Sequence, residues 1–291
     1  MEKSAAENKT NGKPAERPQN ENTRGRIKPG ILPMPLANGI RNENTWDMSR
    51  NFKIDRILEM LAFFKPDTNG SWHKTKENAI AVLSAVMSGL EENRNELAVV
   101  TKTFHHSVRL AYLCEHIGGE AGFDKESVRE LWLAALFHDI GKALIPNGIH
   151  LSDEKLEKPE FAQLVKPHAN DGKALLLLTE NLRHIAAIAG MHHERYDGSG
   201  YPNGSKGDGI GKMAGIIAAA DAFDAMVAGD RLNKKKRSVE DALLELQGES
   251  GREFRPDAVL AFVNAKPGLG AFYKKINSPK WRCELASAIA D

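Results

Sequence analysis

The sequence SVRELWLAALFHDIGK, residues 127–142, indicates both the fold class and the chemistry of this chain. Its apolar residues recur at the spacing of an amphipathic α-helix, at Val128, Leu131, Trp132, Ala135 and Leu136. Asp139 occupies the next position on this face, so a carboxylate is predicted to point into the core. Because an unpaired buried charge is strongly destabilising, this carboxylate must be protonated, paired with a base or bound to a metal ion.

Other histidines and aspartates extend the apolar faces of predicted helices in the same way. His138 lies about 100° round the helix from Asp139 and can bind the same ion. Farther upstream, His106 continues an apolar face, whereas its neighbour His105 shares a face with Arg109 and is predicted to face solvent. Spacing therefore predicts that the following residues point inward: His106, His138, Asp139, His168, His192 and Asp221.

These inward residues must be weighed against an ordinary core. A single inward histidine, such as His168 on the apolar face of Phe161 and Leu164, is more often hydrogen bonded than a metal ligand. Several together would make a costly core without an ion, whereas a pair of metal ions would satisfy all of them. Imidazole and carboxylate ligands favour iron, manganese or another first-row ion, and the lack of cysteine in the set argues against structural zinc.

Helical spacing continues over most of the chain, so we expect an all-α fold. It begins near residue 52, and strand patterns are almost absent. Further helices are predicted at 98–117, 125–140, 158–179, 181–192, 211–228, 238–247 and 256–265. The pattern divides the chain into a tail at 1–50, a helical accessory segment at 51–97 and the main domain at 98–291.

The tail is predicted to be disordered. It holds five of the thirteen prolines, many asparagines and little apolar periodicity, so it cannot bury enough surface to offset the entropy of ordering. Its apolar patch, GILPMPLANGI at 30–40, is interpreted either as a docking segment or as a tolerated linker.

Composition argues against several classes of protein. With 40 basic and 39 acidic residues the net charge is +1, which does not favour binding of nucleic acid in bulk. No apolar run reaches the roughly 20 residues of a membrane span, so no membrane anchor is expected. The two cysteines, Cys114 and Cys283, lie far apart and suit a reducing compartment, which predicts a cytoplasmic protein.

Four motifs stand in the order and spacing of a known family. They are His106-Ser-Val-Arg, HDIGK at 138–142, HHERYDGSGYPNG at 192–204 and DAFDA at 221–225. Over roughly 100–265 the chain resembles the HD-GYP family, a subgroup of the HD superfamily of metal-dependent phosphohydrolases. The resemblance implies an HD-type helical bundle around a binuclear metal site. It also implies hydrolysis of cyclic di-GMP to linear pGpG, and in some members on to GMP.

The resemblance implies roles for individual residues. It adds His193 to the ligand set, which becomes His106, His138, Asp139, His168, His192, His193 and Asp221. Asp139 would bridge two ions, with a water or hydroxide between them as the nucleophile. Lys142 would act in catalysis by binding the phosphate oxygen on which negative charge grows. The simpler interpretation of Lys142 is a lysine that offsets a helix dipole.

Substrate contacts are expected in two further segments. The resemblance places the loop with Gly200, Tyr201 and Pro202 near substrate and makes it a contact for GGDEF-type diguanylate cyclases. Tyr201 and Pro202 could equally well only hold the shape of the loop. The family carries a segment with basic residues at both ends, and Arg231 and Lys234 keep these ends here although the middle differs. The two residues are candidate phosphate or guanine contacts. Alternatively, they belong to a solvated turn.

Two other residues bear on the site. Glu194 either orients a ligand histidine or is solvated. Some family members hold a third ion through a glutamate four residues before the first ligand histidine, but Lys102 stands there, so two ions are expected.

Three functions remain open from the sequence. They are an active cyclic di-GMP phosphodiesterase, a non-catalytic cyclic di-GMP receptor or scaffold, and another HD-type nucleotide phosphohydrolase. The intact ligand set argues against the receptor, and the GYP loop against the last. The oligomeric state is left open, with a homodimer as one option.

Overall fold

The computed structural model describes residues 48–88, 94–145, 158–228, 236–281 and 283. The α-helices are α2 (Met48–Leu61), α3 (Trp72–Ser88), α4 (Arg94–Glu120), α5 (Lys125–Phe137), α6 (Lys158–Glu160), α7 (His168–Leu178), α8 (Ala186–Ala189), α9 (Lys212–Val227), α10 (Val239–Gly248) and α11 (Pro256–Ile276). The 3₁₀-helices are η1 (Ile140–Leu144), η4 (Glu180–Ile185) and η5 (Gly207–Gly209), and η3 (Phe161–Val165) is a π-helix. Within the described ranges no strand occurs, so the predicted all-α fold is confirmed.

Some predictions fall on parts of the chain that the structure does not describe. The tail at 1–50, with its apolar patch, lies outside the described residues except for 48–50, which begin α2. Arg231 and Lys234 lie outside them as well. The boundary between an accessory segment and the main domain at 97 and 98 stays a prediction.

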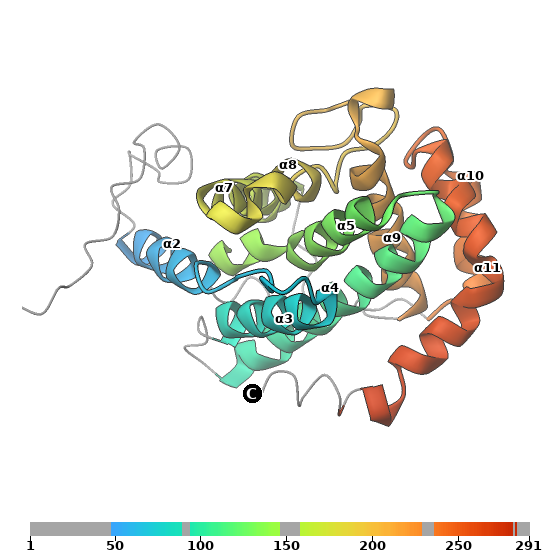
Figure 1. Ribbon diagram of the computed structural model, residues 1–291. Helices are drawn as coiled ribbons and strands as arrows, with labels where there is room; N and C mark the ends of the chain where they lie inside the picture. The colour runs from blue at the N-terminus through green and yellow to red at the C-terminus, as the bar shows by residue number, and fades with distance from the viewer. Residues whose placement is uncertain (1–47, 89–93, 146–157, 229–235, 282, 284–291) are drawn as a thin grey trace, which may run out of the picture. The chain divides into compact units, whose positions relative to one another are not determined.

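Helix α5 packs against neighbours on several sides (Figure 1). Asp124 caps its first turn by accepting a hydrogen bond from the backbone N–H of Ser127, at 2.8 Å. Every residue from Leu131 to Phe137 is buried, because this half of α5 is covered by helices that include α3, α4, α8 and α9. The apolar face predicted from spacing is therefore part of a helix that is buried all round near its end.

The end of α5 differs from the prediction. The helix stops at Phe137 instead of 140, and His138 and Asp139 form a turn that leads into the 3₁₀-helix η1. The backbone N–H of Lys142 donates to the carbonyl of Asp139 at 2.9 Å, a three-residue step that tightens the chain. Asp139 thus faces the interior from a turn at the end of a buried helix.

The helix predicted at 158–179 is interrupted. Between α6 and α7 the segment η3 is a π-helix, in which the N–H of Lys166 donates to the carbonyl of Phe161 at 3.1 Å. Pro167 follows and has no N–H with which to continue a regular helix. As a result Phe161 is exposed, and His168 is buried at the start of α7 without continuing the face of Phe161 that spacing predicted.

Two further helices differ in extent. The helix predicted at 181–192 is the 3₁₀-helix η4 followed by the short α8, so His192 and His193 lie in a turn beyond Ala189. Helix α11 continues to Ile276, past its predicted end at 265.

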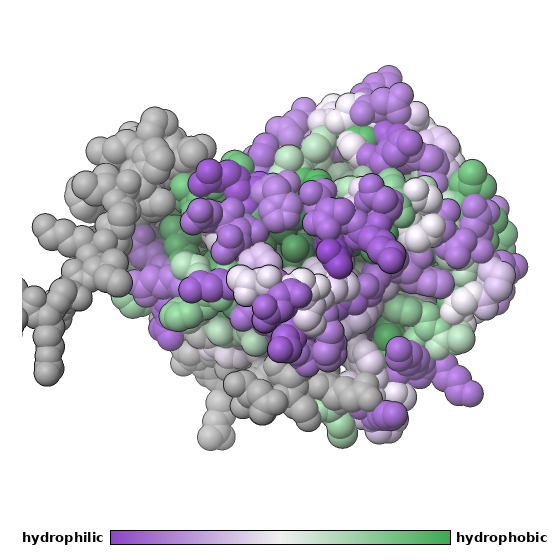
Figure 2. All heavy atoms as spheres, viewed as in Figure 1, coloured by the Kyte–Doolittle hydropathy of each residue, from purple (hydrophilic) through white to green (hydrophobic). Residues whose placement is uncertain are grey.

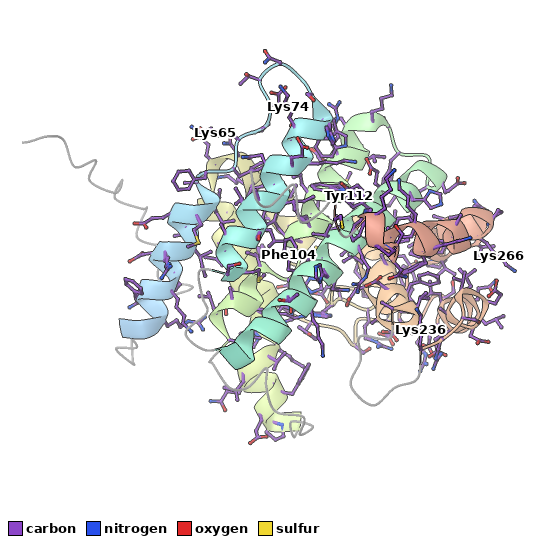
Figure 3. All side chains as sticks on the ribbon, turned by 90° about the horizontal axis from the view of Figure 1, so that it is seen from below. Lys65, Lys74, Phe104, Tyr112, Lys236 and Lys266 are labelled. Atoms are coloured by element: carbon purple, nitrogen blue, oxygen red, sulfur yellow. The ribbon has the colours of Figure 1, made fainter. Side chains whose placement is uncertain are left out.

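Helices α3 and α4 are joined by a partly buried ion pair. The ammonium of Lys76 lies 2.6 Å from the carboxylate of Glu115 and 4.9 Å from the centre of the Tyr112 ring. Figure 3 shows Phe104 and Tyr112 on α4 among the helices. In the view of Figure 2 the described surface is mostly hydrophilic, with hydrophobic residues in small separate groups.

Candidate metal centre

Asp139 lies at the meeting point of two groups of side chains whose ligand atoms are close enough together to hold a metal ion. One group is Asp139, His168, His192 and His193, and the other is His106, His138 and Asp139. Within each group one ligand atom of every residue lies within 4.8 Å of the others. The structure thus brings together six of the seven predicted ligands around one carboxylate. The seventh, Asp221, joins them through His106, whose Nε2 lies 3.0 Å from its Oδ1.

Three of the histidines are oriented by their own backbone. The Nδ1 atoms of His138, His168 and His192 lie 2.7–2.8 Å from the carbonyl oxygens of Ala135, Val165 and Ala189, each three residues upstream. A carbonyl only accepts, so each Nδ1 carries the proton and donates it. The Nε2 atom, which carries a lone pair when such a ring is neutral, therefore faces Asp139 or another histidine.

The arrangement of these lone pairs fits a cation. His168 Nε2 lies 3.4 Å from His192 Nε2 and 3.2 Å from His193 Nε2, so one cation placed among the three rings could be reached by all three nitrogens. Among the described residues, His138 Nε2 and Asp139 Oδ1 are buried without a hydrogen-bond partner. Metal-binding histidines commonly donate their other ring N–H to a carbonyl, as three of these do.

Electrostatics keep the acids charged and leave His193 neutral. Burial alone would raise the pKa of Asp139, but His138 and Lys142 hold it well below the usual range. Burial would also raise the pKa of Asp221, but its hydrogen bond to His106 lowers it far below that range. Burial, with the nearby His192, lowers the pKa of His193 well below its usual value. Asp139 and Asp221 therefore offer anionic oxygens and His193 offers an unprotonated ring, and these are the forms that bind metals.

His106 is held between two carboxylates. Its Nε2 faces Asp221, and its Nδ1 lies 2.8 Å from Oδ2 of Asp224, a fully buried acid on α9. Burial lowers the pKa of His106, but the hydrogen bonds to Asp221 and Asp224 outweigh it and raise the pKa to about 10. Binding of an ion at Nε2 would therefore displace a proton from this ring.

The sequence analysis missed Asp224. Its carboxylate also accepts hydrogen bonds from Nε and Nη2 of Arg109, at 3.2 and 2.9 Å, and from the hydroxyl of Tyr273, at 3.0 Å. Arg109, which shares a helical face with His105 in the sequence, is buried, because its pairing with Asp224 draws the guanidinium into the core. Asp224 lies three residues after Asp221 on α9, so the same helical spacing could have selected it.

Two glycines set the distance between Asp139 and His168. A Cβ at Gly141 would lie 2.0 Å from the carbonyl oxygen of His168 and 2.5 Å from the backbone nitrogen of Gly172. No side chain fits there, so η1 and α7 touch through their backbones. This contact holds His168 Nε2 3.3 Å from Asp139 Oδ1.

Glu194 shapes the glycine-rich loop. It is buried, and its carboxylate accepts hydrogen bonds from the backbone N–H groups of Asn203 and Ser205, at 2.7 and 2.9 Å. Both earlier interpretations, a partner of a ligand histidine and a solvated acid, are therefore wrong. Gly200 has no room for a side chain, because a Cβ would lie 2.3 Å from the backbone nitrogen of Arg195. The loop is folded back onto the residues that follow His193.

Tyr201 connects this loop to the cluster. Its ring stacks on that of His193 with centroids 4.7 Å apart, and the peptide bond between Tyr201 and Pro202 is cis. Lys166 is exposed, and its ammonium lies 5.1 Å from the centre of the Tyr201 ring. Lys142 also contacts the cluster, with its Nζ 2.5 Å from Oδ2 of Asp139. Burial lowers the pKa of Lys142, but Asp139 and Asp221 raise it overall, so the ammonium stays charged.

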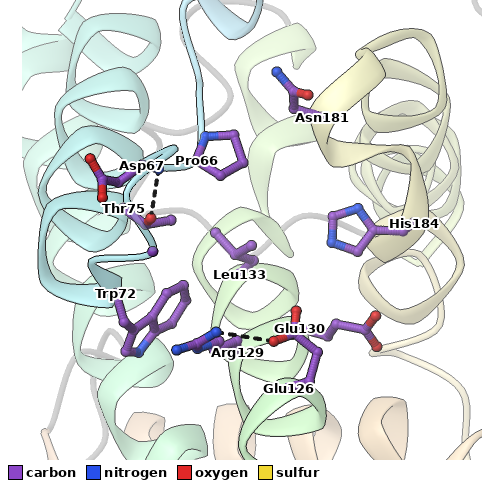
Figure 4. Close-up of a pocket in the computed structure, with 11 residues that line it drawn as sticks. Pro66, Asp67, Trp72, Thr75, Glu126, Arg129, Glu130, Leu133, Asn181 and His184 are labelled. Carbon is purple, nitrogen blue, oxygen red and sulfur yellow. Dashed lines mark hydrogen bonds and ion pairs between the residues drawn. The ribbon is translucent and has the colours of Figure 1, made fainter.

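A separate cavity lies elsewhere in the molecule (Figure 4). It has a volume of about 200 Å³ and is lined by residues of 66–75, α5 and η4, among them Trp72, Arg129 and His184. None of the seven predicted ligands lines it. Arg129 is paired with Glu126 at 3.1 Å, and the N–H of Asp67 donates to Thr75. The metal-binding groups and this cavity are therefore distinct features.

The sequence model of the HD domain family matches residues 91–258, more than half of the chain. The chain belongs to the HD domain family. The match includes every predicted metal ligand, and the HD-GYP resemblance inferred from the motifs is confirmed. In this HD domain the paired His138 and Asp139 lie in the turn after α5.

Comparisons with individual proteins agree with this membership. A cyclic di-GMP phosphodiesterase of Thermotoga maritima is 32% identical over 247 residues, 84% of this chain and 65% of that protein. The 3'3'-cGAMP-specific phosphodiesterase 1 of Vibrio cholerae is 32% identical over 169 residues, 58% of this chain and 38% of that protein. The chain thus spans less than two thirds of the length of either relative.

A solved structure shares the fold of the HD domain. The crystal structure of the cyclic GMP-AMP specific phosphodiesterase V-cGAP3 of V. cholerae has a TM-score of 0.50 and 18% identity, covering 72% of this chain and 52% of that one. The likeness concerns the fold alone. In the part of this chain that the structure describes, no helix is long and apolar enough to cross a membrane.

Proposed function

We propose that this chain is a metal-dependent phosphodiesterase that hydrolyses cyclic di-GMP to pGpG, and on to GMP if the linear product is also accepted. The observation that carries the proposal is the position of Asp139, whose carboxylate belongs to both metal-binding groups. A carboxylate shared in this way can hold two ions close together, as two-metal hydrolysis of a phosphodiester requires. The names of the curated relatives support a cyclic dinucleotide as the substrate.

The proposed centre holds two divalent ions, iron or manganese. His106, His138 and Asp221 would bind on one side of Asp139, and His168, His192 and His193 on the other. Oxygen and imidazole donors without thiolates suit these metals. When bound, the ions would lower the pKa of a water molecule and stabilise the oxygens of an in-line displacement at phosphorus.

The remaining steps belong to side chains of the chain itself. Lys142 is charged beside Asp139 and would donate to the phosphate oxygen that gains negative charge. The loop with Gly200, Tyr201 and Pro202 would form one wall for the nucleotide, because the Tyr201 ring already stacks on a ligand histidine. Arg231 and Lys234 remain proposed phosphate or guanine contacts.

Two alternatives are distinguished by experiment. The cGAMP-specific relative makes 3'3'-cGAMP a second candidate substrate. A non-catalytic receptor would bind the cyclic dinucleotide without cleaving it. Contacts of the loop with GGDEF-type cyclases, action in the cytoplasm and a homodimer are also proposed; the exposed tip at Asn203 and Gly204 supports the first of these.

A turnover assay tests the proposal. The full chain, purified without oxygen and supplied with Mn²⁺ or Fe²⁺, is incubated with cyclic di-GMP or 3'3'-cGAMP, and the linear products are separated by chromatography. We expect pGpG from cyclic di-GMP, no product from the Asp139→Asn variant, and an unchanged rate from Glu59→Gln, which alters an exposed acid on α2. Tight binding of cyclic di-GMP by the metal-loaded protein without cleavage would support the receptor, and faster cleavage of 3'3'-cGAMP would change the assigned substrate.

A further inference from the structure

Arg50 lies outside the segment that matches the HD domain, yet it contacts two elements of the metal centre. It is the third residue of α2, and the family match begins at residue 91. Its Nη2 lies 2.8 Å from Oδ2 of Asp171 on α7, and its Nη1 donates to the carbonyl oxygen of Leu144 in η1 at 3.4 Å. One guanidinium group therefore bridges η1 and α7.

Both of these elements carry residues of the proposed centre. Helix η1 directly follows Asp139 and contains Lys142, while α7 begins with His168. Asp171 is three residues after His168, and therefore lies near it on the first turn of α7. The bridge formed by Arg50 consequently spans the same two elements whose side chains meet in the cluster.

The two elements pack directly against each other, and Arg50 adds a polar link between them. At Gly141 the backbones of η1 and α7 touch so closely that a Cβ would overlap the His168 carbonyl. At Leu144, three residues farther along, Arg50 adds a polar link to this packing. The separation of Asp139 and His168 depends on how η1 and α7 are placed against each other, and a charged link between them restrains that placement further.

The chemistry of the bridge favours arginine. The guanidinium group presents several donors in a rigid plane, so it can reach a carboxylate and a carbonyl at once, which a single ammonium does less well. The side chain of Arg50 is 26% exposed and that of Asp171 is 13% exposed. Partial burial protects the pair from the screening that weakens exposed ion pairs.

We infer that Arg50 is a positioning residue of the metal centre, which acts through Asp171 and Leu144 on the distance between Asp139 and His168. This inference rests on the proposed metal binding. It makes α2 a part of the site in function, although its sequence lies outside the family match.

Metal affinity is the direct test. Full-length wild type, Arg50→Gln, Arg50→Lys and a control are stripped of metal and titrated with Mn²⁺ by calorimetry, and the melting temperature of each metal-free protein is recorded. The control is Arg56→Gln, an exposed arginine on the same helix. We expect Mn²⁺ to bind Arg50→Gln about tenfold more weakly, as is common for residues that support ligands, with a smaller loss for Arg50→Lys and no change for Arg56→Gln.

A double substitution separates positioning from general stability. If Arg50 acts through Asp171, then Asp171→Asn also weakens Mn²⁺ binding, and the double variant loses less than the two single losses combined. Equal Mn²⁺ affinity of wild type and Arg50→Gln would overturn the inference. The inference would also be overturned if the loss of Mn²⁺ affinity were proportional to the fall in the metal-free melting temperature across all variants, since that result marks a purely structural role. Failure of wild type to bind Mn²⁺ would instead overturn the proposed function.

Discussion

Asp224 and His106 form a hydrogen bond of 2.8 Å on the side of the imidazole ring opposite Asp221. The bond fixes the ring so that Nε2 faces the other candidate ligands. Because Arg109 and Tyr273 bind the same carboxylate, the orientation of a residue on α4 depends on contributions from α9 and α11.

We predict that Asp224→Asn lowers the affinity for Mn²⁺ by about 10–100-fold, since partners of ligand histidines have effects of this size. It should also reduce the free energy of unfolding by about 3–5 kcal/mol, because Arg109 is left as a buried charge without its anion. Titration calorimetry and chemical denaturation measure the two effects. Tyr273→Phe, which keeps the charge, is the control; an Asp224→Asn protein that is destabilised but binds Mn²⁺ normally would limit Asp224 to a structural role.

Asp139 is predicted to be needed for both ions, because its carboxylate belongs to both groups. Metal analysis of anaerobically prepared protein should find almost none in Asp139→Ala, whereas His193→Ala should keep about one ion, bound by the group that lacks His193. The prediction fails if Asp139→Ala retains a full equivalent of metal.

The contact at Gly141 should not tolerate a methyl group. We expect Gly141→Ala to lower the free energy of unfolding by about 1–3 kcal/mol or more through overpacking, and to weaken metal binding. Gly119 on α4 is a matched control, since a Cβ there meets nothing within 4 Å. Gly119→Ala should be neutral or stabilising, by up to about 1 kcal/mol. Thermal unfolding of both variants measures the two effects. Equal stabilities of Gly141→Ala and Gly119→Ala would contradict the prediction.

Tyr201 is predicted to act through its ring. Removal of the ring in Tyr201→Ala should raise KM for cyclic di-GMP by about tenfold, equivalent to about 1.4 kcal/mol, while Tyr201→Phe stays near wild type. Steady-state kinetics at saturating Mn²⁺ provide the measurement. If Tyr201→Ala instead lowers stability and leaves KM unchanged, the residue only holds the loop.

The number of ions is predicted to be two. Lys102 is exposed on α4, one turn before His106, and a protonated amine cannot bind a cation. Metal analysis should therefore give about two ions per chain. A reproducible value of three, with an ion near residue 102, would show that another side chain supplies the missing ligand.

Helical spacing correctly predicted the inward-facing residues that lie on regular helices. His106 and Asp221 were found in this way, because α4 and α9 are long and continuous. His168 was selected by an argument that the π-helix η3 contradicts, although its burial is confirmed. His193 lies in a turn beyond α8, where no period applies, and only the family resemblance identified it.

The remaining features depend on contacts that no local pattern specifies. Glu194 precedes an irregular loop and binds amides nine and eleven residues away, which neither composition nor spacing reveals. Arg50 reaches partners 94 and 121 residues away in sequence, so its position depends on the packing of α2 against η1 and α7. Asp224 differs from these residues, because helical spacing along α9 could have predicted it although it was not selected.

The imidazole groups of His138, His168 and His192 take their proton positions from main-chain oxygens three residues upstream. A carbonyl is present whatever the side chain, so the residues at 135, 165 and 189 can change during evolution without altering which nitrogen faces the proposed metal site. Substitution at these positions is then restricted only by packing. The proton positions can therefore survive changes of side chain next to the histidines, with the most freedom at Val165, because Ala135 and Ala189 are fully buried in the core.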